Sequence, residues 1–176
     1  MKEIHLSRRE FLRAGAAVSA GTLLMPRGAF AAGSDRIRVA MIGCGARGTK
    51  DAIDCLKADP AVEIVALADM FQDRLDRALA ELKKQFADRV KVTPETSFLG
   101  FDAYKKIMAM REVDIVLLLT PPGFRPPMVR AAVEAGKHIF MEKPGAVDPV
   151  GIHTLMASAD LADQKRLSIV VGTQQR

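Results

Sequence analysis

The stretch that decides the fold is Ile37-Arg38-Val39-Ala40-Met41-Ile42-Gly43-Cys44-Gly45-Ala46-Arg47-Gly48, in which an apolar run leads into three closely spaced glycines. A helical pattern follows over residues 47–58, and a second apolar run over residues 63–68 ends at Asp69. This order of strand, glycine loop, helix and strand predicts a parallel βαβ unit.

The glycine spacing matches the fingerprint of dinucleotide-binding loops. Gly43 would allow the tight turn, Gly45 would let a pyrophosphate approach the backbone, and Gly48 would let the helix pack closely on the strand. Ala46 and Arg47 complete the loop, and the phosphates are expected at the N-terminus of the following helix. Six residues alone are a weak signal, but the strand before them and the helix after them strengthen it.

Asp69 ends the second strand, 21 residues after Gly48. A carboxylate there can accept hydrogen bonds from the adenosine ribose and repel a 2′-phosphate, so the sequence predicts NAD, with NADP less favoured. A helix N-cap is the alternative role for Asp69, and the two roles can coexist. Arg74 could reach the adenine or face solvent, and Arg47 could contact a phosphate or face water.

Beyond this unit, strand-like runs alternate with amphipathic helical ones, as in a parallel sheet covered by helices on both faces. Six strands are expected at residues 37–42, 63–68, 90–92, 114–119, 138–141 and 168–171, and five helices at residues 47–58, 72–87, 101–110, 126–135 and 149–164. Gly136 is expected to end one helix, and Asp148 with Pro149 to begin another. The fold class is therefore α/β, a Rossmann-type doubly wound parallel sheet.

Residues 1–32 are interpreted as a targeting peptide, which leaves residues 33–176 as the folded domain. The motif Ser7-Arg8-Arg9-Glu10-Phe11-Leu12 precedes a mildly apolar stretch of residues 11–25, and Ala29-Phe30-Ala31 offers a cleavage site after Ala31 or Ala32. The apolar stretch is shorter than the roughly 20 residues of a transmembrane helix. The motif resembles the twin-arginine export signal, so we expect a periplasmic or extracellular protein. An amphipathic N-terminal helix with a chance pair of arginines is the alternative.

The formal net charge of +5 does not indicate nucleic-acid binding. More than half of it falls in residues 1–31, and the remaining basic residues are interspersed with acids. Cys44 and Cys55 would lie roughly 13–15 Å apart if the second rides the helix that follows the first. A disulfide needs Cα atoms within about 7 Å, so two free thiols are expected.

The second half of the chain carries a more specific pattern. Thr120-Pro121 ends the apolar run of residues 115–119, and Gly136-Lys137-His138 leads through a further strand to Glu142-Lys143-Pro144. Together with the glycine loop, these residues resemble the N-terminal domain of the glucose–fructose oxidoreductase/inositol dehydrogenase/MocA family, over residues 36–176. The resemblance implies an NAD cofactor and a sugar or polyol hydroxyl as substrate.

In that family the segment corresponding to Glu142-Lys143-Pro144 borders the nicotinamide ring, which implies that Lys143 is the catalytic residue beside the reacting carbon. Glu142 could orient Lys143 or contact the nicotinamide ribose, and Thr120 and Pro121 would line the cofactor. The alternative for Lys143 is a surface lysine in a loop. His138 is expected to begin a strand.

The chain also departs from the family. Many members have Asn-x-x-His after Thr-Pro, whereas this chain has Arg125, which cannot lose its proton near neutral pH. Members also continue into a second α+β domain, so a fragment or truncated product is expected here. A non-catalytic NAD(H)-binding module and an NAD-dependent glycoside hydrolase of the same family are the alternatives. Surface that a second domain would cover favours association into a homo-oligomer.

Overall fold

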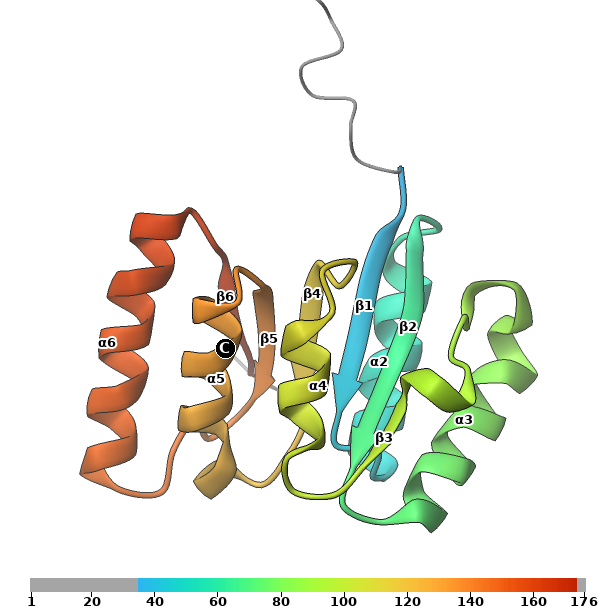
Figure 1. The fold of residues 1–176 in the computed structure, drawn as a ribbon, viewed down its shortest axis with the longest axis horizontal. Coiled ribbons are helices and arrows are strands. Elements are labelled where there is room, and N and C mark those ends of the chain that lie inside the picture. The colour runs from blue at the N-terminus through green and yellow to red at the C-terminus, as the bar shows by residue number, and fades with distance from the viewer. Residues whose placement is uncertain (1–34, 174–176) are drawn as a thin grey trace, which may run out of the picture. The chain divides into compact units, whose positions relative to one another are not determined.

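The computed structural model describes residues 35–173, so the predicted targeting peptide of residues 1–32 lies outside the described part of the chain. The described residues form one parallel sheet of six strands in the order β3-β2-β1-β4-β5-β6 (Figure 1). The strands are β1 (Ile37–Ile42), β2 (Val62–Asp69), β3 (Ser97–Leu99), β4 (Ile115–Leu118), β5 (His138–Glu142) and β6 (Ile169–Gly172). The α/β doubly wound class is confirmed.

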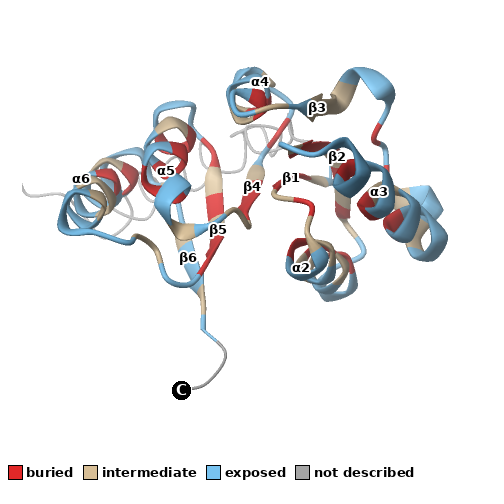
Figure 2. Ribbon diagram, turned by 90° about the horizontal axis from the view of Figure 1, so that it is seen from below, coloured by how far each residue is buried: buried red, intermediate tan, exposed pale blue. Residues whose placement is uncertain are grey.

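Five α-helices connect these strands, with three short 3-10 helices between them. They are α2 (Ala46–Ala58), α3 (Gln72–Phe86), α4 (Ala103–Ala109), α5 (Arg125–Glu134) and α6 (Pro149–Lys165), with η1 (Ala87–Arg89), η2 (Pro94–Thr96) and η3 (Pro122–Phe124). Helices α2 and α3 cover one face of the sheet, and α4, α5 and α6 cover the other (Figure 2).

Strand β1 lies at the centre of the sheet, which separates two apolar clusters, one on each face. Its residue Met41 pairs with Leu67 of β2 on one side and with Leu117 of β4 on the other. Because side chains alternate along a strand, Met41 packs with α2 and α3, whereas Ile42 packs with α4 and α5. The chain order reverses between β1 and β4, and a doubly wound sheet binds its ligand at that switch point.

The third predicted strand, at residues 90–92, is wrong. Only an isolated bridge joins Val90 to Ile64, and the strand in that position of the sheet is β3, which pairs with residues 67–69 of β2. Val90 and Val92 are 4% and 3% exposed because they fill the core under α3, so their apolar character reflects burial rather than pairing. The other expected strands and helices are confirmed to within two residues at either end.

The predicted helix boundaries have the expected chemistry. Gly136 takes a φ of +73° directly after α5, and the Asp148 carboxylate accepts a hydrogen bond of 2.6 Å from the backbone N–H of Gly151 at the start of α6. His138 begins β5, as expected, and its Nδ1 accepts a hydrogen bond from the Ser168 N–H. Cys44 and Cys55 are both free, as expected. Within residues 35–173, no helix is long and apolar enough to cross a membrane.

Candidate dinucleotide site

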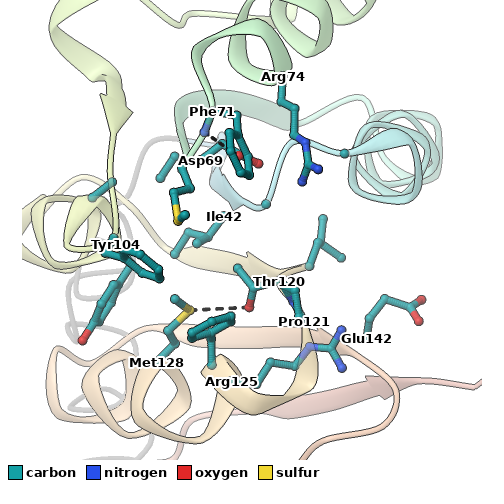
Figure 3. Close-up of a pocket in the computed structure, with 18 of the residues that line it drawn as sticks. Ile42, Asp69, Phe71, Arg74, Tyr104, Thr120, Pro121, Arg125, Met128 and Glu142 are labelled. Carbon is teal, nitrogen blue, oxygen red and sulfur yellow. Dashed lines mark hydrogen bonds between the residues drawn. The ribbon is translucent and has the colours of Figure 1, made fainter.

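A cleft of about 490 Å³ opens at the carboxyl ends of the strands, over the switch point between β1 and β4. The segments that follow β1, β2, β3 and β4 all contribute to its wall, as does the end of β5 (Figure 3). Parallel strands bring these segments to one edge of the sheet, which is where open α/β sheets bind ligands. The cleft therefore lies where the sequence predicts a dinucleotide.

Each glycine of the loop meets a different steric condition. Gly43 has a φ of +101°, and a Cβ there would lie 2.7 Å from the backbone carbon of Leu119. A Cβ at Gly48 would collide with the Gly43 carbonyl oxygen, so only glycine lets α2 pack against the loop. A Cβ at Gly45 would meet no atom within 4 Å, since this position faces open space in the cleft. These conditions fit a tight turn, close packing and an approach route for a pyrophosphate.

Ala46 begins α2, and Gly45 forms its N-cap without a side-chain hydrogen bond. The first turn of α2 holds no acidic residue, so nothing there competes with an anion for the helix dipole. Free N–H groups at this position suit the phosphates of a dinucleotide.

Asp69 closes the cleft on the β2 side. Its Oδ2 accepts a hydrogen bond of 2.6 Å from the Cys44 N–H, and its Oδ1 accepts one of 2.9 Å from the Phe71 N–H. Each carboxylate oxygen keeps a lone pair, so the fixed carboxylate can still accept from two ribose hydroxyls. The alternative helix-cap role is wrong, because α3 begins at Gln72 with Phe71 as its N-cap and no side chain caps it.

Arg74 lies over the ring of Phe71, with its guanidinium carbon 4.7 Å from the ring centroid. Both side chains line the cleft next to Asp69 (Figure 3). This stacked pair offers a flat, partly apolar surface that suits a purine ring.

Arg47 does not simply face water. Its Nη2 lies 2.5 Å from Oε1 of Glu142 at the end of β5, and its Nε lies 3.1 Å from Oδ1 of Asp51 one turn along α2. The hydrogen bond that Arg47 donates to Glu142, and then the charge of Asp51, raise the pKa of Arg47. Sequence reasoning missed these ion pairs, and Glu142 stands 95 positions away, beyond any local pattern.

Thr120, Pro121 and Lys143 line the same cleft as the glycine loop. The Thr120 hydroxyl donates to Sδ of Met128 at 3.6 Å, which turns it towards α5. The Lys143 N–H donates to Oε2 of Glu142 at 3.2 Å, and the peptide bond between Lys143 and Pro144 is cis. Within residues 35–173, the Lys143 ammonium forms no ion pair, so its charge is available to a ligand.

Arg125 stands at the first position of α5 and is only 4% exposed. Its Nη1 donates to the Pro144 carbonyl, and its Nε has no hydrogen-bond partner. Burial lowers the pKa of the Arg125 guanidinium, and the charge of Glu142 opposes that shift. Arg125 also lines the cleft, a role that the sequence did not indicate.

The fold, the glycine loop and the carboxylate at the end of β2 define a dinucleotide-binding Rossmann domain. A family model described as "Oxidoreductase family, NAD-binding Rossmann fold" matches residues 37–172. The chain therefore belongs to the Gfo/Idh/MocA family, and its domain is an NAD-binding one. A model of the twin-arginine translocation signal matches residues 5–25, which indicates export by that pathway.

Curated relatives carry glycosidase names. A glycosyl hydrolase family 109 protein of Stenotrophomonas maltophilia is 37% identical over 139 residues, which is 78% of this chain and 29% of the relative. An alpha-N-acetylgalactosaminidase of Shewanella oneidensis is 30% identical over 168 residues, covering 84% of this chain and 35% of the relative. The chain thus spans about a third of the length of the curated relatives it matches.

Solved structures share the fold. Scyllo-inositol dehydrogenase from Lactobacillus casei, solved with NAD(H) and scyllo-inositol, matches with a TM-score of 0.61 and 23% identity, over 78% of this chain and 36% of that one. An NAD-binding oxidoreductase from Klebsiella pneumoniae matches with a TM-score of 0.59 and 25% identity, over 79% of this chain and 35% of that one.

Proposed function

We propose that this chain is the nucleotide-binding part of an exported NAD-dependent oxidoreductase that acts on a sugar or polyol hydroxyl. One observation carries the proposal: Gly45, Asp69 and Lys143 line a single cleft although they stand in distant parts of the sequence. Residues 1–32 would be the targeting peptide, cleaved after Ala31 or Ala32, and residues 33–176 the NAD-binding domain.

The cofactor would lie across the switch point. Gly43, Gly45, Ala46, Arg47 and Gly48 would hold the pyrophosphate, and Asp69 would accept hydrogen bonds from the adenosine ribose. The nicotinamide end of the cofactor would lie against the segment after β4 and against the end of β5 with the residues that follow it. The residues concerned are Thr120, Pro121, Glu142, Lys143 and Pro144.

Lys143 would be the catalytic residue. Bound NAD supplies the hydride acceptor. The Lys143 ammonium would donate a hydrogen bond to the substrate hydroxyl oxygen and stabilise the negative charge that develops there as the hydroxyl proton passes to water in the open cleft. Glu142 supports this role, since its carboxylate accepts from the Lys143 N–H and so fixes the backbone at that point.

NADH fluorescence titration of the full chain tests the cofactor part of this proposal. We expect saturable binding of one NADH per chain, and binding of NADPH about tenfold weaker or more, because Asp69 would repel the 2′-phosphate. The Lys143→Met variant should keep NADH binding, since the glycine loop and Asp69 are unchanged. Absence of saturable binding by the folded chain would overturn the proposal.

A second candidate is an NAD-dependent glycoside hydrolase. The names of the curated relatives favour it, since the identities reach 37% and 30%. Incubation with a glycoside, with and without added NAD, separates the two reactions. Release of free sugar without added NAD indicates a hydrolase, and accumulation of NADH when NAD is added indicates a dehydrogenase. If NADH binds and neither product forms, the chain is a binding module without catalysis.

Association into a homo-oligomer stays a prediction. Val150 and Met156 on α6 are 75% and 60% exposed, and Val170 on the neighbouring strand β6 is 53% exposed. Exposed apolar surface of this kind favours self-association. Light scattering checks this, and a monodisperse monomer would count against it.

A further inference from the structure

The buried guanidinium of Arg125 lacks a carboxylate of its own. Within the described residues 35–173, it forms no ion pair, and the Pro144 carbonyl is its one recorded hydrogen-bond acceptor. A guanidinium carries five N–H donors, so one neutral carbonyl leaves most of them unused. A buried charge is ordinarily paired, because desolvation without a partner is costly.

The position of Arg125 in its helix adds to this imbalance. Arg125 is the first residue of α5, where the helix dipole is positive, and the first turn of α5 contains no acidic residue. Pro126 and Pro127 follow it and carry no N–H, so α5 itself gives little hydrogen bonding to an anion. The guanidinium is therefore the main donor that this helix end offers to the cleft.

Glu142 is the carboxylate whose charge acts on Arg125, but it is already engaged. Its Oε1 accepts from Arg47 at 2.5 Å, and its Oε2 accepts from the Lys143 N–H at 3.2 Å. Figure 3 shows the Arg125 guanidinium beside Pro121, extending towards Glu142. Lys143 adds a further unpaired cation to the same wall of the cleft. Arg47 has a second carboxylate partner in Asp51, whereas Arg125 and Lys143 form no ion pair within residues 35–173.

A purely structural role would explain less. The bond from Arg125 to the Pro144 carbonyl ties η3 and α5 to the segment after β5, but a single neutral donor would suffice for that bond. A planar guanidinium matches a carboxylate with two parallel hydrogen bonds, which a structural strut does not need.

We propose that Arg125, next to Lys143, forms an anion subsite for a carboxylate carried by the substrate, so that the substrate class is a sugar acid such as a uronate. This inference rests on the proposed function, because the subsite lies where the substrate would meet the nicotinamide end of the cleft. The carboxylate would complete the hydrogen bonding of Arg125, while Lys143 would remain beside the hydroxyl that reacts.

Calorimetric titration of sugars into the full chain saturated with NADH tests the subsite. Two matched pairs differ only at carbon 6: glucuronate with glucose, and galacturonate with galactose. We expect at least one uronate to bind about tenfold more tightly than its neutral partner, as a charge-assisted pair would give. Glucose 6-phosphate is the further arm, and tighter binding of this phosphate than of either uronate would overturn the carboxylate assignment.

Substitutions test whether Arg125 causes the preference for the uronate. Arg125→Gln should abolish the preference for the uronate, and Arg125→Lys should keep part of it, because the charge remains without the planar fork. Arg130→Gln is the matched control, since Arg130 lies exposed on the same helix and pairs with Glu134. If Arg125→Gln does not fold, Arg125→Lys and the wild-type comparison still decide the question.

The outcomes separate the two proposals. No NADH binding by the wild-type chain overturns the proposed function, and this inference with it. NADH binding with equal affinity for acid and neutral sugar in both pairs, or with no uronate binding, overturns the subsite alone. A preference for the uronate that survives Arg125→Gln also overturns it.

Discussion

The guanidinium of Arg47 and the carboxylate of Glu142 lie 2.5 Å apart and join the start of α2 to the end of β5 across the cleft. The two partners differ in exposure, since the Arg47 side chain is 46% exposed and that of Glu142 only 7%. Because a buried charge that loses its partner is costly, the effect of removing either residue depends on how buried the groups that remain are.

We therefore expect Glu142→Gln to lower the free energy of unfolding by about 1–3 kcal/mol, because Arg125 loses the Glu142 charge that offsets its desolvation. Arg47→Gln should also lower the free energy of unfolding, since it leaves Glu142 and Asp51, whose side chains are 7% and 9% exposed, without their cation. Urea unfolding of both variants and of the double variant measures the coupling between them.

The control for Arg47→Gln is Lys50→Gln, which removes an exposed ion pair with Asp54 on the same helix. Arg47→Gln should then cost more stability than Lys50→Gln, because the Asp54 side chain is 53% exposed and water can replace its lost partner. Equal losses of stability for Arg47→Gln and Lys50→Gln would contradict the argument from burial.

Gly45 and Gly48 give a matched pair of substitutions with opposite consequences. Gly48→Ala should lower the free energy of unfolding by about 1–3 kcal/mol, because the new Cβ collides with the Gly43 carbonyl oxygen. Gly45→Ala should leave stability unchanged within about 1 kcal/mol, since its φ of −70° suits alanine and its Cβ meets no atom within 4 Å. Thermal unfolding with and without NADH measures both.

Gly45→Ala, which should leave stability unchanged, should instead affect NADH binding. Gly45→Ala should weaken NADH binding about tenfold or more, because the methyl group occupies the approach route of the pyrophosphate. Unchanged NADH affinity in Gly45→Ala would show that the pyrophosphate does not bind against Gly45.

The glycine loop illustrates what the sequence can predict. The roles of Gly43, Gly45 and Gly48 follow from contacts within one βαβ unit, so their spacing alone indicates them. The bounds of β1 were likewise correct, because an apolar run that ends in a glycine turn has few alternatives.

Some features could not be predicted from the sequence. They are the contacts of Arg47 and Arg125 and the position of the third strand. Arg47 contacts Glu142 at the end of β5, and Arg125 contacts Pro144 just after it, and no local pattern predicts these contacts. The valines of residues 90–92 are as apolar as a strand, but they fill a core space under α3 while the short edge strand β3 forms later. These contacts and the position of the third strand depend on tertiary packing, which cannot be read from a single sequence.

Asp69→Asn should weaken NADH binding about tenfold and reduce the preference for NADH over NADPH. The amide keeps an acceptor for the Cys44 N–H but loses the charge that holds the ribose hydroxyls and repels a 2′-phosphate. Fluorescence titration with both cofactors measures the change. Asp73→Asn is the control, because Asp73 is exposed in the first turn of α3 and pairs with Arg77. An equal effect of the two substitutions would contradict a specific role for Asp69.

Cys44 should make the chain less stable at alkaline pH. Burial, and then the neighbouring charge of Asp69, raise the pKa of the Cys44 thiol, so the folded chain keeps a proton that the unfolded chain loses. The unfolded thiol titrates near its ordinary pKa of about 8.5, so this contribution to stability is complete below that pH and is lost above it.

The loss should approach about 1.4 kcal/mol per pH unit above the ordinary pKa of the thiol, and Cys44→Ser should remove it, because the hydroxyl does not titrate there. Urea unfolding between pH 7.5 and 10, a range around the ordinary thiol pKa, compares the two slopes. Other titrating groups, including the buried Lys137, are present in both proteins and cancel. Cys55→Ser should change the slope less, since Cys55 is only half-buried and desolvation alone raises its pKa. Equal slopes for the wild-type chain and Cys44→Ser would mean that the Cys44 thiol ionises as readily in the folded chain as in the unfolded one.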